Sequence, residues 1–299
     1  MNRLPTKTRR LRPRSSSDSV LPYVWMLCGS FSFTLMSELT HALGSRCAWQ
    51  VIALSRASLA LVFAATLARA GGARLVLWKP RTLWVRSIAG SLSLVGTFFA
   101  LTRIPVSDVL TLTNMFPIWV AFLSWPLLKE TPSPRVWLSV ASGIAGVILI
   151  QQPHFAEGNF ASLIALGSSF FTAVAMIGLH RLAAVDPRAI VAHFSGVSVL
   201  FCIPTFFLFD RNNTTEETFS AQTALLLLCV GVTATIGQIF LTKAFAAGTP
   251  AKVSIVGLTQ VVLAMALDIV LWHRSFVAAT LVGFFLVLAP TAWLLLRRE

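Results

Sequence analysis

The sequence predicts an all-α membrane protein, and three observations support this fold class. Of its 299 residues, 56% are hydrophobic and only 12% are charged, about half the charged fraction usual in a soluble globular protein. The mean hydropathy is +0.77, so the chain has too few polar groups to cover a water-soluble fold. Its apolar residues form long continuous runs, without the alternation typical of membrane-spanning strands. We therefore expect the lipid bilayer to be its environment.

Ten stretches are long enough to be membrane-spanning helices, each near the roughly 20 apolar residues that a bilayer requires. The basic segment before the first stretch resembles the start of a signal peptide, but the apolar run that follows is too long and has no cleavage site. Residues 1–20 are therefore expected to be a disordered cytoplasmic tail, and residues 297–299 a cytoplasmic end. The ten expected spans are 21–43, 49–69, 84–102, 106–128, 135–151, 160–180, 189–209, 222–243, 250–272 and 276–296.

The distribution of basic residues predicts that both termini are cytoplasmic. With that orientation, nineteen Lys and Arg residues, Arg86 among them, fall on the cytoplasmic side and four fall outside, as the positive-inside rule requires. The net charge of +13 is thus explained by topology in a plasma or inner membrane, and nucleic acid is not an expected partner. The four cysteines have neither zinc-site nor disulfide spacing, and no metal or cofactor is expected.

The spans divide into two sets of five, residues 21–151 and 152–296. Shifting the chain by 144 residues aligns Gly90-Ser91 with Ala234-Thr235, although identities are few and the loop spacing carries most of the comparison. Because five is odd, the second set enters the membrane from the opposite side. This arrangement predicts two inverted five-helix repeats, an architecture of secondary transporters with a binding site between the halves.

Several motifs resemble the EamA-type drug/metabolite transporters. In the first half these are the run from Gly96 to Leu101, the segment from Pro105 to Asn114, and Phe116-Pro117-Ile118 followed by Leu128-Lys129-Glu130. In the second half, the runs beginning at Gly237 and Val253 resemble the second EamA repeat, but His273-Arg274 stands where a closing Gly-Glu is typical. The resemblance covers residues 21–296. It implies a ten-helix bundle around a central cavity that moves small metabolites or drugs, commonly outward.

Charged residues inside a span are costly unless they face a partner or a wet cavity. In the first span, Glu38 shares a polar stripe with four other residues. Glu38 and Arg56 each lie about 8–11 Å from the outer ends of neighbouring spans, at 1.5 Å per residue. They are expected either to form a structural ion pair or to act in transport. In the second case Glu38 carries a proton or cation, and Arg56 is its switchable partner or an anchor for a substrate carboxylate. The other residues of the stripe, candidates for the cavity lining, are Ser30, Thr34, Ser37 and His41.

Polar residues in later spans complete the candidate site. Asn114 faces the same way as Thr111, near a proline that frees a backbone carbonyl. Gln238 and Thr235 lie on a face of small residues that serves either helix packing or the cavity. Gln260 is the best candidate of the second half for hydrogen-bonding a solute, and Asp268 is either part of the same face or an interfacial residue.

The expected function is secondary active transport of amino-acid-like or aromatic solutes, or drugs, by alternating access. Phe98, Phe116 and Trp119 are candidate aromatic residues of the lining, although Trp119 would equally suit lipid or core packing. A channel-like facilitator is the alternative. An intramembrane enzyme is a further one, but the sequence has no recognisable nucleophile, metal or phosphate-binding motif. The segment containing Asn212 and Asn213 has two glycosylation acceptors, which matter only in a eukaryotic secretory pathway. The sequence does not indicate an oligomeric state.

Overall fold

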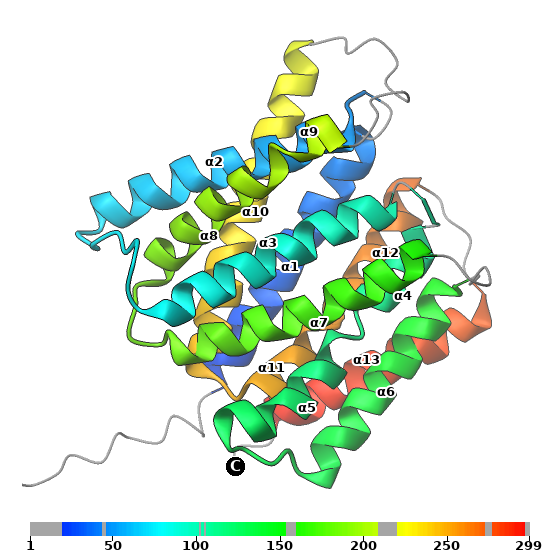
Figure 1. Ribbon diagram of the computed structural model, residues 1–299. Coiled ribbons are helices and arrows are strands. Elements are labelled where there is room, and N and C mark those ends of the chain that lie inside the picture. The colour runs from blue at the N-terminus through cyan, green and yellow to red at the C-terminus, as the bar shows by residue number, and fades with distance from the viewer. Residues whose placement is uncertain are drawn as a thin grey trace, which may run out of the picture.

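The computed structural model describes residues 20–43, 46–101, 103–104, 106–153, 160–208, 220–272 and 277–296. The basic tail, the acceptors Asn212 and Asn213, His273-Arg274 and residues 297–299 lie outside them. The described chain is helical and contains no strand (Figure 1). Its helices are α1 (Leu21–Leu43), α2 (Trp49–Ala70), α3 (Arg81–Leu101), α4 (Val106–Thr113), α5 (Phe116–Leu128), α6 (Pro134–Gln151), α7 (Phe160–Arg181), α8 (Pro187–Cys202), α9 (Thr205–Leu208), α10 (Ala221–Ala247), α11 (Pro250–Gly257), α12 (Thr259–Trp272) and α13 (Ala278–Leu296).

Nine stretches of the described residues are long and apolar enough to cross a membrane, so the chain is a multi-pass membrane protein. They correspond to the second to tenth expected spans. The helix α1 matches the limits of the first expected span, but it is not among the nine because the polar stripe from Ser30 to His41 makes it less apolar.

Three expected spans are interrupted rather than continuous. The span 106–128 divides into α4 and α5 beside Asn114, and the span 250–272 divides into α11 and α12 at Leu258. The span 189–209 ends in the short helix α9 after Pro204. Pro117 in the first turn of α5 explains the first interruption, because proline has no N–H to continue the preceding helix.

Several helices begin where the sequence supplies the expected starting residues. Pro134, Pro187 and Pro250 occupy the first turns of α6, α8 and α11, where the missing proline N–H leaves no hydrogen bond unmade. Asp186 caps α8 by accepting a hydrogen bond from Arg188 N, and Ser220 caps α10 through Thr223 N.

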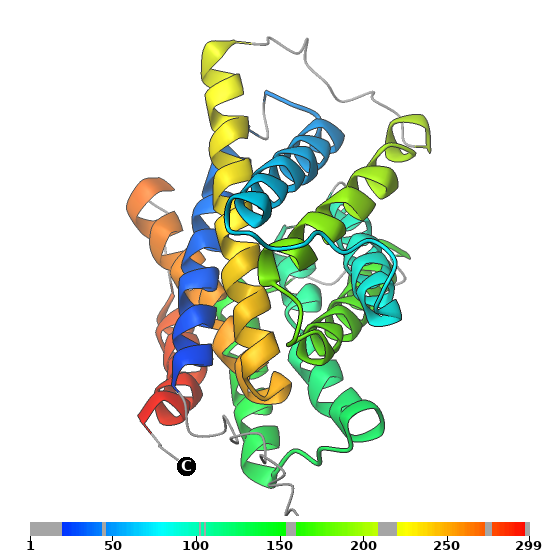
Figure 2. The same ribbon diagram turned by 90° about the vertical axis from the view of Figure 1, so that its left-hand side faces the viewer.

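Four pairs of helices from the two halves of the chain form the principal contacts: α1 with α10, α2 with α8, α3 with α7, and α6 with α13. Figure 2 shows α1 running alongside the long α10. The helices α6 and α13 lie very close together at two glycines. A Cβ atom added to Gly146 would lie 2.7 Å from the Gly283 carbonyl oxygen, and one added to Gly283 would lie 2.8 Å from the Gly146 carbonyl oxygen. Glycine at both positions therefore permits direct backbone contact.

The core is one large apolar cluster that joins both halves of the chain. Phe245, Leu179, Ile190 and Ile255 are fully buried members. Phe116 packs against this cluster and against a second one between α6, α12 and α13. The exposed apolar side chains, by contrast, lie on the outer faces that a bilayer would cover.

Candidate functional site

Two arginines lie within the helices that surround a narrow cavity. Arg56 belongs to α2 and is half-buried, and Arg86 belongs to α3 and is 1% exposed. Arg86 was counted in the sequence among the cytoplasmic cations. The structure shows that Arg86 is buried among the helices near the start of α3, which begins at Arg81.

The guanidinium of Arg86 is held between two helices. Its Nη2 donates to Oε1 of Gln238 on α10 over 3.2 Å. Its Cζ lies 3.9 Å from the ring centroid of Phe194 on α8, a distance typical of a cation–π contact. The Nε and Nη1 atoms are buried and have no hydrogen-bond partner. Arg86 is therefore a desolvated cation with unused hydrogen-bonding capacity.

Small residues create the space that Arg86 occupies. A Cβ atom on Gly90 would lie 2.7 Å from Nη1 of Arg86 and 2.8 Å from the Phe194 ring, and one on Gly178 would lie 3.0 Å from Cβ of Arg86. Any larger side chain at Gly90 would displace the guanidinium from the face of Phe194.

A narrow cavity of about 10 Å³, which we call the arginine cavity, lies next to this cluster. Arg56 and Gln238 line it together with the Phe194 ring, which also contacts Arg86. The remaining walls are small or apolar and come from α2, α3, α8 and α10: Ala57, Ala60, Leu94, Ser195, Ser198 and Ala234. Among the described residues, no hydrogen bond or ion pair reaches the Arg56 side chain.

Buried polar contacts fasten α3 to α8 around the cluster. Ser87 Oγ lies 2.8 Å from Nδ1 of His193, whose Nε2 lies 3.1 Å from the Leu77 carbonyl oxygen. Ser91 Oγ lies 3.0 Å from Ser198 Oγ. Since these groups satisfy one another, they act as fixed walls rather than as free ligands.

The expected pair of Glu38 and Arg56 is not joined by an ion pair. Glu38 is a half-buried residue of α1, whereas Arg56 faces the cavity between α2, α8 and α10. Arg56 is instead brought together with Gln238, another residue selected from the sequence. His41 is exposed at the end of α1.

A second group of selected residues lies where α1 meets α12. Ser30 and Thr34 are fully buried, and Oγ of Ser30 has no hydrogen-bond partner. Thr34 Oγ1 donates to the Ser30 carbonyl oxygen over 2.9 Å and lies 3.4 Å from that of Gln260. Asp268 is half-buried further along α12.

Asn114 lies at the junction between α4 and α5, where its Nδ2 donates to the Leu110 carbonyl oxygen over 2.8 Å. Thr111 and Thr235 are buried, and each donates to a carbonyl oxygen one turn earlier in its own helix. Both hydroxyl donors are therefore engaged within their own helices.

The selected aromatic residues lie in three different settings. Trp119 Nε1 donates to Ser169 Oγ over 2.9 Å, which ties α5 to α7. Phe98 stacks on Trp49 with ring centroids 5.9 Å apart. Phe116 packs in the core. None of the three lines the arginine cavity.

A wider groove of about 390 Å³ lies between α6 and α13. Arg135 is its one charged lining residue, and it is exposed at the start of α6. The described lining of the groove includes no buried charged side chain, so the groove offers fewer groups for binding a charged solute than the arginine cavity does.

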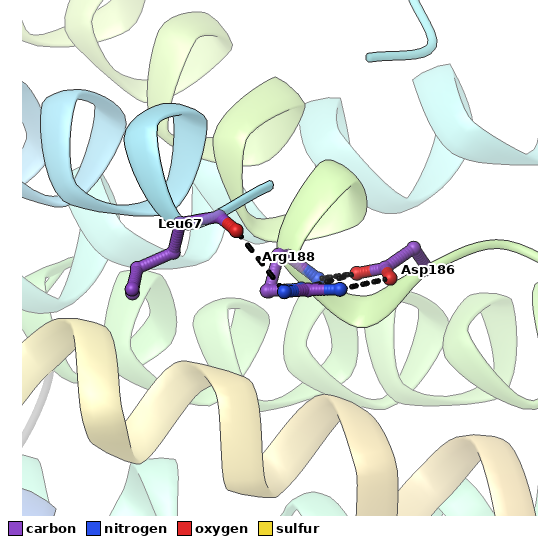
Figure 3. A network of polar contacts seen from close by, with 3 residues as sticks. All are labelled: Leu67, Asp186 and Arg188. Atoms are coloured by element: carbon purple, nitrogen blue, oxygen red, sulfur yellow. Dashed lines mark hydrogen bonds and ion pairs between the residues drawn. The ribbon is translucent and has the colours of Figure 1, made fainter. Parts of the chain in front are cut away.

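A surface network joins the ends of α2 and α8, as Figure 3 shows. The guanidinium of Arg188 donates from Nε to Oδ1 of Asp186 over 3.0 Å and from Nη2 to Oδ2 over 2.8 Å. Its Nη1 donates to the Leu67 carbonyl oxygen in the last turn of α2 over 3.0 Å. The hydrogen bonds from Arg188 lower the pKa of the Asp186 carboxyl below its usual range. The network fixes the distance between α2 and α8 at this end.

Within the described part of the chain, no three His, Cys, Asp or Glu side chains gather as metal ligands. The arginine cavity presents the guanidinium of Arg56 and the amide of Gln238, and Arg86 contacts the lining residues Gln238 and Phe194. These groups are suited to recognise negative charge.

Comparison with known proteins identifies related transporters. The sequence profile described as the EamA-like transporter family matches residues 20–152 and 159–296. The pseudopaline exporter CntI of Pseudomonas aeruginosa is 28% identical over 218 residues, which cover 72% of this chain and 75% of that protein. Solute carrier family 35 member G1 of Homo sapiens is 24% identical over 230 residues, which cover 72% of this chain and 62% of that protein.

Two further similarities extend the comparison. A riboflavin transporter of Rhizobium johnstonii is 23% identical over 251 residues, covering 79% of this chain and 78% of that protein. One solved crystal structure superposes with a TM-score of 0.77 at 18% identity, covering 90% of this chain and 97% of that one. At this identity the superposition shows a shared fold.

Proposed function

Because the chain belongs to the EamA-like transporter family, and membrane transport is the activity for which its relatives are named, we propose that it is a secondary active transporter. It moves a small organic metabolite, amino-acid-like or aromatic, or a drug, by alternating access. The observation that carries this proposal is a pair of broken helices in corresponding positions of the two halves.

The two breaks lie at matching positions, and they contain two residues, Asn114 and Met115, in the first half and one, Leu258, in the second. The helix α4 has eight residues before the break and α5 has thirteen after it, and α11 has eight residues and α12 fourteen. The backbone at Met115 and Leu258 stays in the right-handed helical region, and Leu258 N donates to the Ile255 carbonyl oxygen, so both breaks are local irregularities. Helices broken at corresponding positions of two halves are typical of the binding region of secondary transporters. Asn114 lies in the first break, and Gln260 follows the second by two residues.

The helix contacts support two inverted repeats of five spans, with α1 as the tenth span. If α1 corresponds to α7, α2 to α8, α3 to α10, α4–α5 to α11–α12 and α6 to α13, then the contact of α1 with α10 has its counterpart in α7 with α3. Likewise, α1 with α12 corresponds to α7 with α5, and α2 with α10 corresponds to α8 with α3. All these pairs are in contact, as a two-fold relation between the halves requires.

The solute and its coupling ion are proposed to use residues from both groups described above. Arg56 and Gln238 line the cavity between α2, α8 and α10. The unpartnered hydroxyl of Ser30 is buried near Thr34 and Gln260, where it offers a hydrogen bond to a solute. Glu38, on the same helix, is proposed as the group that carries a proton or cation. None of the other selected residues lines the arginine cavity, and they are proposed to line the solute pathway elsewhere in the bundle: Ser30, Thr34, His41, Phe98, Thr111, Phe116, Trp119, Thr235 and Asp268.

We propose that the protein lies in a plasma or inner membrane with both termini in the cytoplasm. This topology rests on the excess of basic residues in the loops on that side. Export is the proposed direction. It is supported by the name of the relative from Pseudomonas aeruginosa, which is an exporter.

The test is flux through the purified full chain in liposomes, measured against a panel of amino acids and aromatic acids with and without an imposed pH gradient. Saturable uptake that responds to the gradient is the expected result. Uptake that rises linearly with solute concentration would favour a channel-like facilitator, and chemical conversion of a solute without flux would favour an enzyme.

A further inference from the structure

We propose that Arg86, together with Arg56 and Gln238, binds the carboxylate of the transported solute. This inference rests on the proposed transport function and names the class of solute, an organic anion. Arg86 had no role in the sequence-based site, where it was placed among the loop cations.

The first argument is charge. Arg56 and Arg86 are two cations within the bundle, and the structure places no carboxylate in an ion pair with either of them among the described residues. Gln238 is neutral, and so is the Phe194 ring that faces Arg86. A buried cation without a counter-ion is unfavourable in an apolar environment, so an anion that reached the guanidinium of Arg86, or of the half-buried Arg56, would be bound favourably.

The second argument is hydrogen bonding. Arg86 uses Nη2 toward Gln238, while Nε and Nη1 are buried without a partner. Buried guanidinium N–H groups are normally satisfied, and leaving them unsatisfied is costly. A carboxylate has two oxygens in one plane and matches the forked donors of a guanidinium. The missing partner is thus an acceptor of this shape.

The third argument is space. The cavity has a volume of about 10 Å³, about the room that one water molecule needs and far below the roughly 300–1,000 Å³ typical of a pocket that encloses a whole organic ligand. A carboxylate can therefore enter only when the surrounding helices move apart, as alternating access requires. The apolar walls Ala57, Ala60 and Leu94 suit the carbon atoms next to a carboxylate better than they suit a hydrated inorganic anion.

Two other ionisable groups lie near the cluster. His193 on α8 is engaged by Ser87 and the Leu77 carbonyl, and Cys202 near the end of α8 is buried. Neither supplies a negative counter-charge in an ion pair. The two arginines are therefore the groups left to recognise the anion.

The probe is benzoate, with benzamide as its neutral counterpart of the same shape. Thermal unfolding of the detergent-purified full chain, followed by tryptophan fluorescence, measures binding without requiring transport. Benzoate is expected to raise the unfolding midpoint saturably, and benzamide is not. Arg86→Gln and Arg56→Gln are each expected to weaken the apparent benzoate affinity about tenfold or more, because each removes a charged hydrogen-bond donor.

The matched control is Arg135→Gln, which removes an exposed cation from the other groove and is expected to leave the benzoate response unchanged. If Arg86→Gln does not fold, Arg86→Lys replaces it, because lysine keeps the charge but lacks the two parallel donors of a guanidinium. A weaker benzoate response is expected from Arg86→Lys, as from Arg56→Gln. Sodium chloride and phosphate at matched ionic strength identify an inorganic-anion site.

Equal responses to benzoate and benzamide would overturn the inference, as would an undiminished benzoate response in the arginine variants or a response to chloride or phosphate as large as that to benzoate. Saturable liposome flux of a neutral solute without arginine-dependent benzoate binding would leave transport standing and remove this anion site. Arginine-dependent benzoate binding without carrier flux would support the anion site and contradict the transporter.

Discussion

Arg86 on α3 donates from Nη2 to Oε1 of Gln238 on α10 over 3.2 Å, and this is the hydrogen bond that the buried guanidinium makes within the described chain. The contact links the two helices across the cavity wall. It also sets the orientation of the Gln238 amide, whose oxygen must face the arginine.

Gln238→Leu is expected to lower the thermal unfolding midpoint of the purified protein. It removes the Arg86 partner and leaves a buried charge unsatisfied, at a cost of about 1–3 kcal/mol. Gln238→Glu is expected to unfold at a higher temperature than Gln238→Leu and to lose the benzoate response, because its carboxylate would take the place of the solute anion. A midpoint for Gln238→Leu equal to that of the unmodified protein would contradict the role of this contact.

The close approach of α6 and α13 yields a prediction about stability. Gly146→Ala would bring a Cβ atom within 2.7 Å of a backbone oxygen on α13, and the helices would have to separate at a cost of about 1–3 kcal/mol. Gly167→Ala on α7 is the control, since no atom lies within 4 Å of its added Cβ and alanine favours a helix. Thermal unfolding should show destabilisation only for Gly146→Ala, and an equal midpoint for both variants would count against the α6–α13 contact.

The Arg188–Asp186 network predicts a pH dependence of stability. Because Arg188 lowers the folded-state pKa of Asp186, the ionised carboxylate stabilises the fold above its unfolded-state pKa of about 3.9. This stabilisation is lost as the pH falls through the lower folded-state pKa. The midpoint of Arg188→Gln should therefore lie below that of the unmodified protein near neutral pH, and the difference should shrink below about pH 4. A difference that does not change between pH 7 and pH 3 would show that the network does not act through Asp186.

Glu38→Gln is expected to abolish the response of transport to an imposed pH gradient while the protein still folds and inserts. The amide keeps the size of the side chain but cannot exchange a proton. Glu130→Gln, at an exposed position after α5, should leave that response intact. If flux through the Glu38→Gln variant keeps its pH dependence in liposomes, Glu38 has no part in coupling.

Much of the helical framework could be predicted from hydropathy alone. The expected first span has the same limits as α1, and the expected fifth span differs from α6 by one residue at its start. Long apolar runs bounded by prolines and charged loops leave little freedom in where a helix begins and ends in a membrane.

The interruption beside Leu258 could not be predicted in this way. The break before α5 is marked by Pro117, whereas the residues around Leu258 are apolar and include no proline. Gly257 directly precedes Leu258, and glycine weakens a helix, but a single glycine inside an apolar run is also compatible with an unbroken span.

The burial of Arg86 also could not be predicted from the sequence. Its position near a run of loop cations favours a cytoplasmic location, and only the approach of Phe194 and Gln238, more than a hundred residues later, buries it. Arg56 could be selected because it is a charged residue inside an apolar run, and Gln238 because it lies on a face of small and polar residues. That Arg56 and Gln238 line the same cavity could not be predicted, since it depends on how α2 packs against α10.

The measurement that tests the central proposal most directly is counterflow in liposomes. Vesicles that contain the purified protein are loaded with a high concentration of an unlabelled solute that shows saturable uptake, and entry of the labelled solute is then followed. A carrier working by alternating access should take up label faster, and transiently above equilibrium, in loaded vesicles than in empty ones. Equal entry rates in loaded and empty vesicles, with flux proportional to concentration, would contradict alternating access.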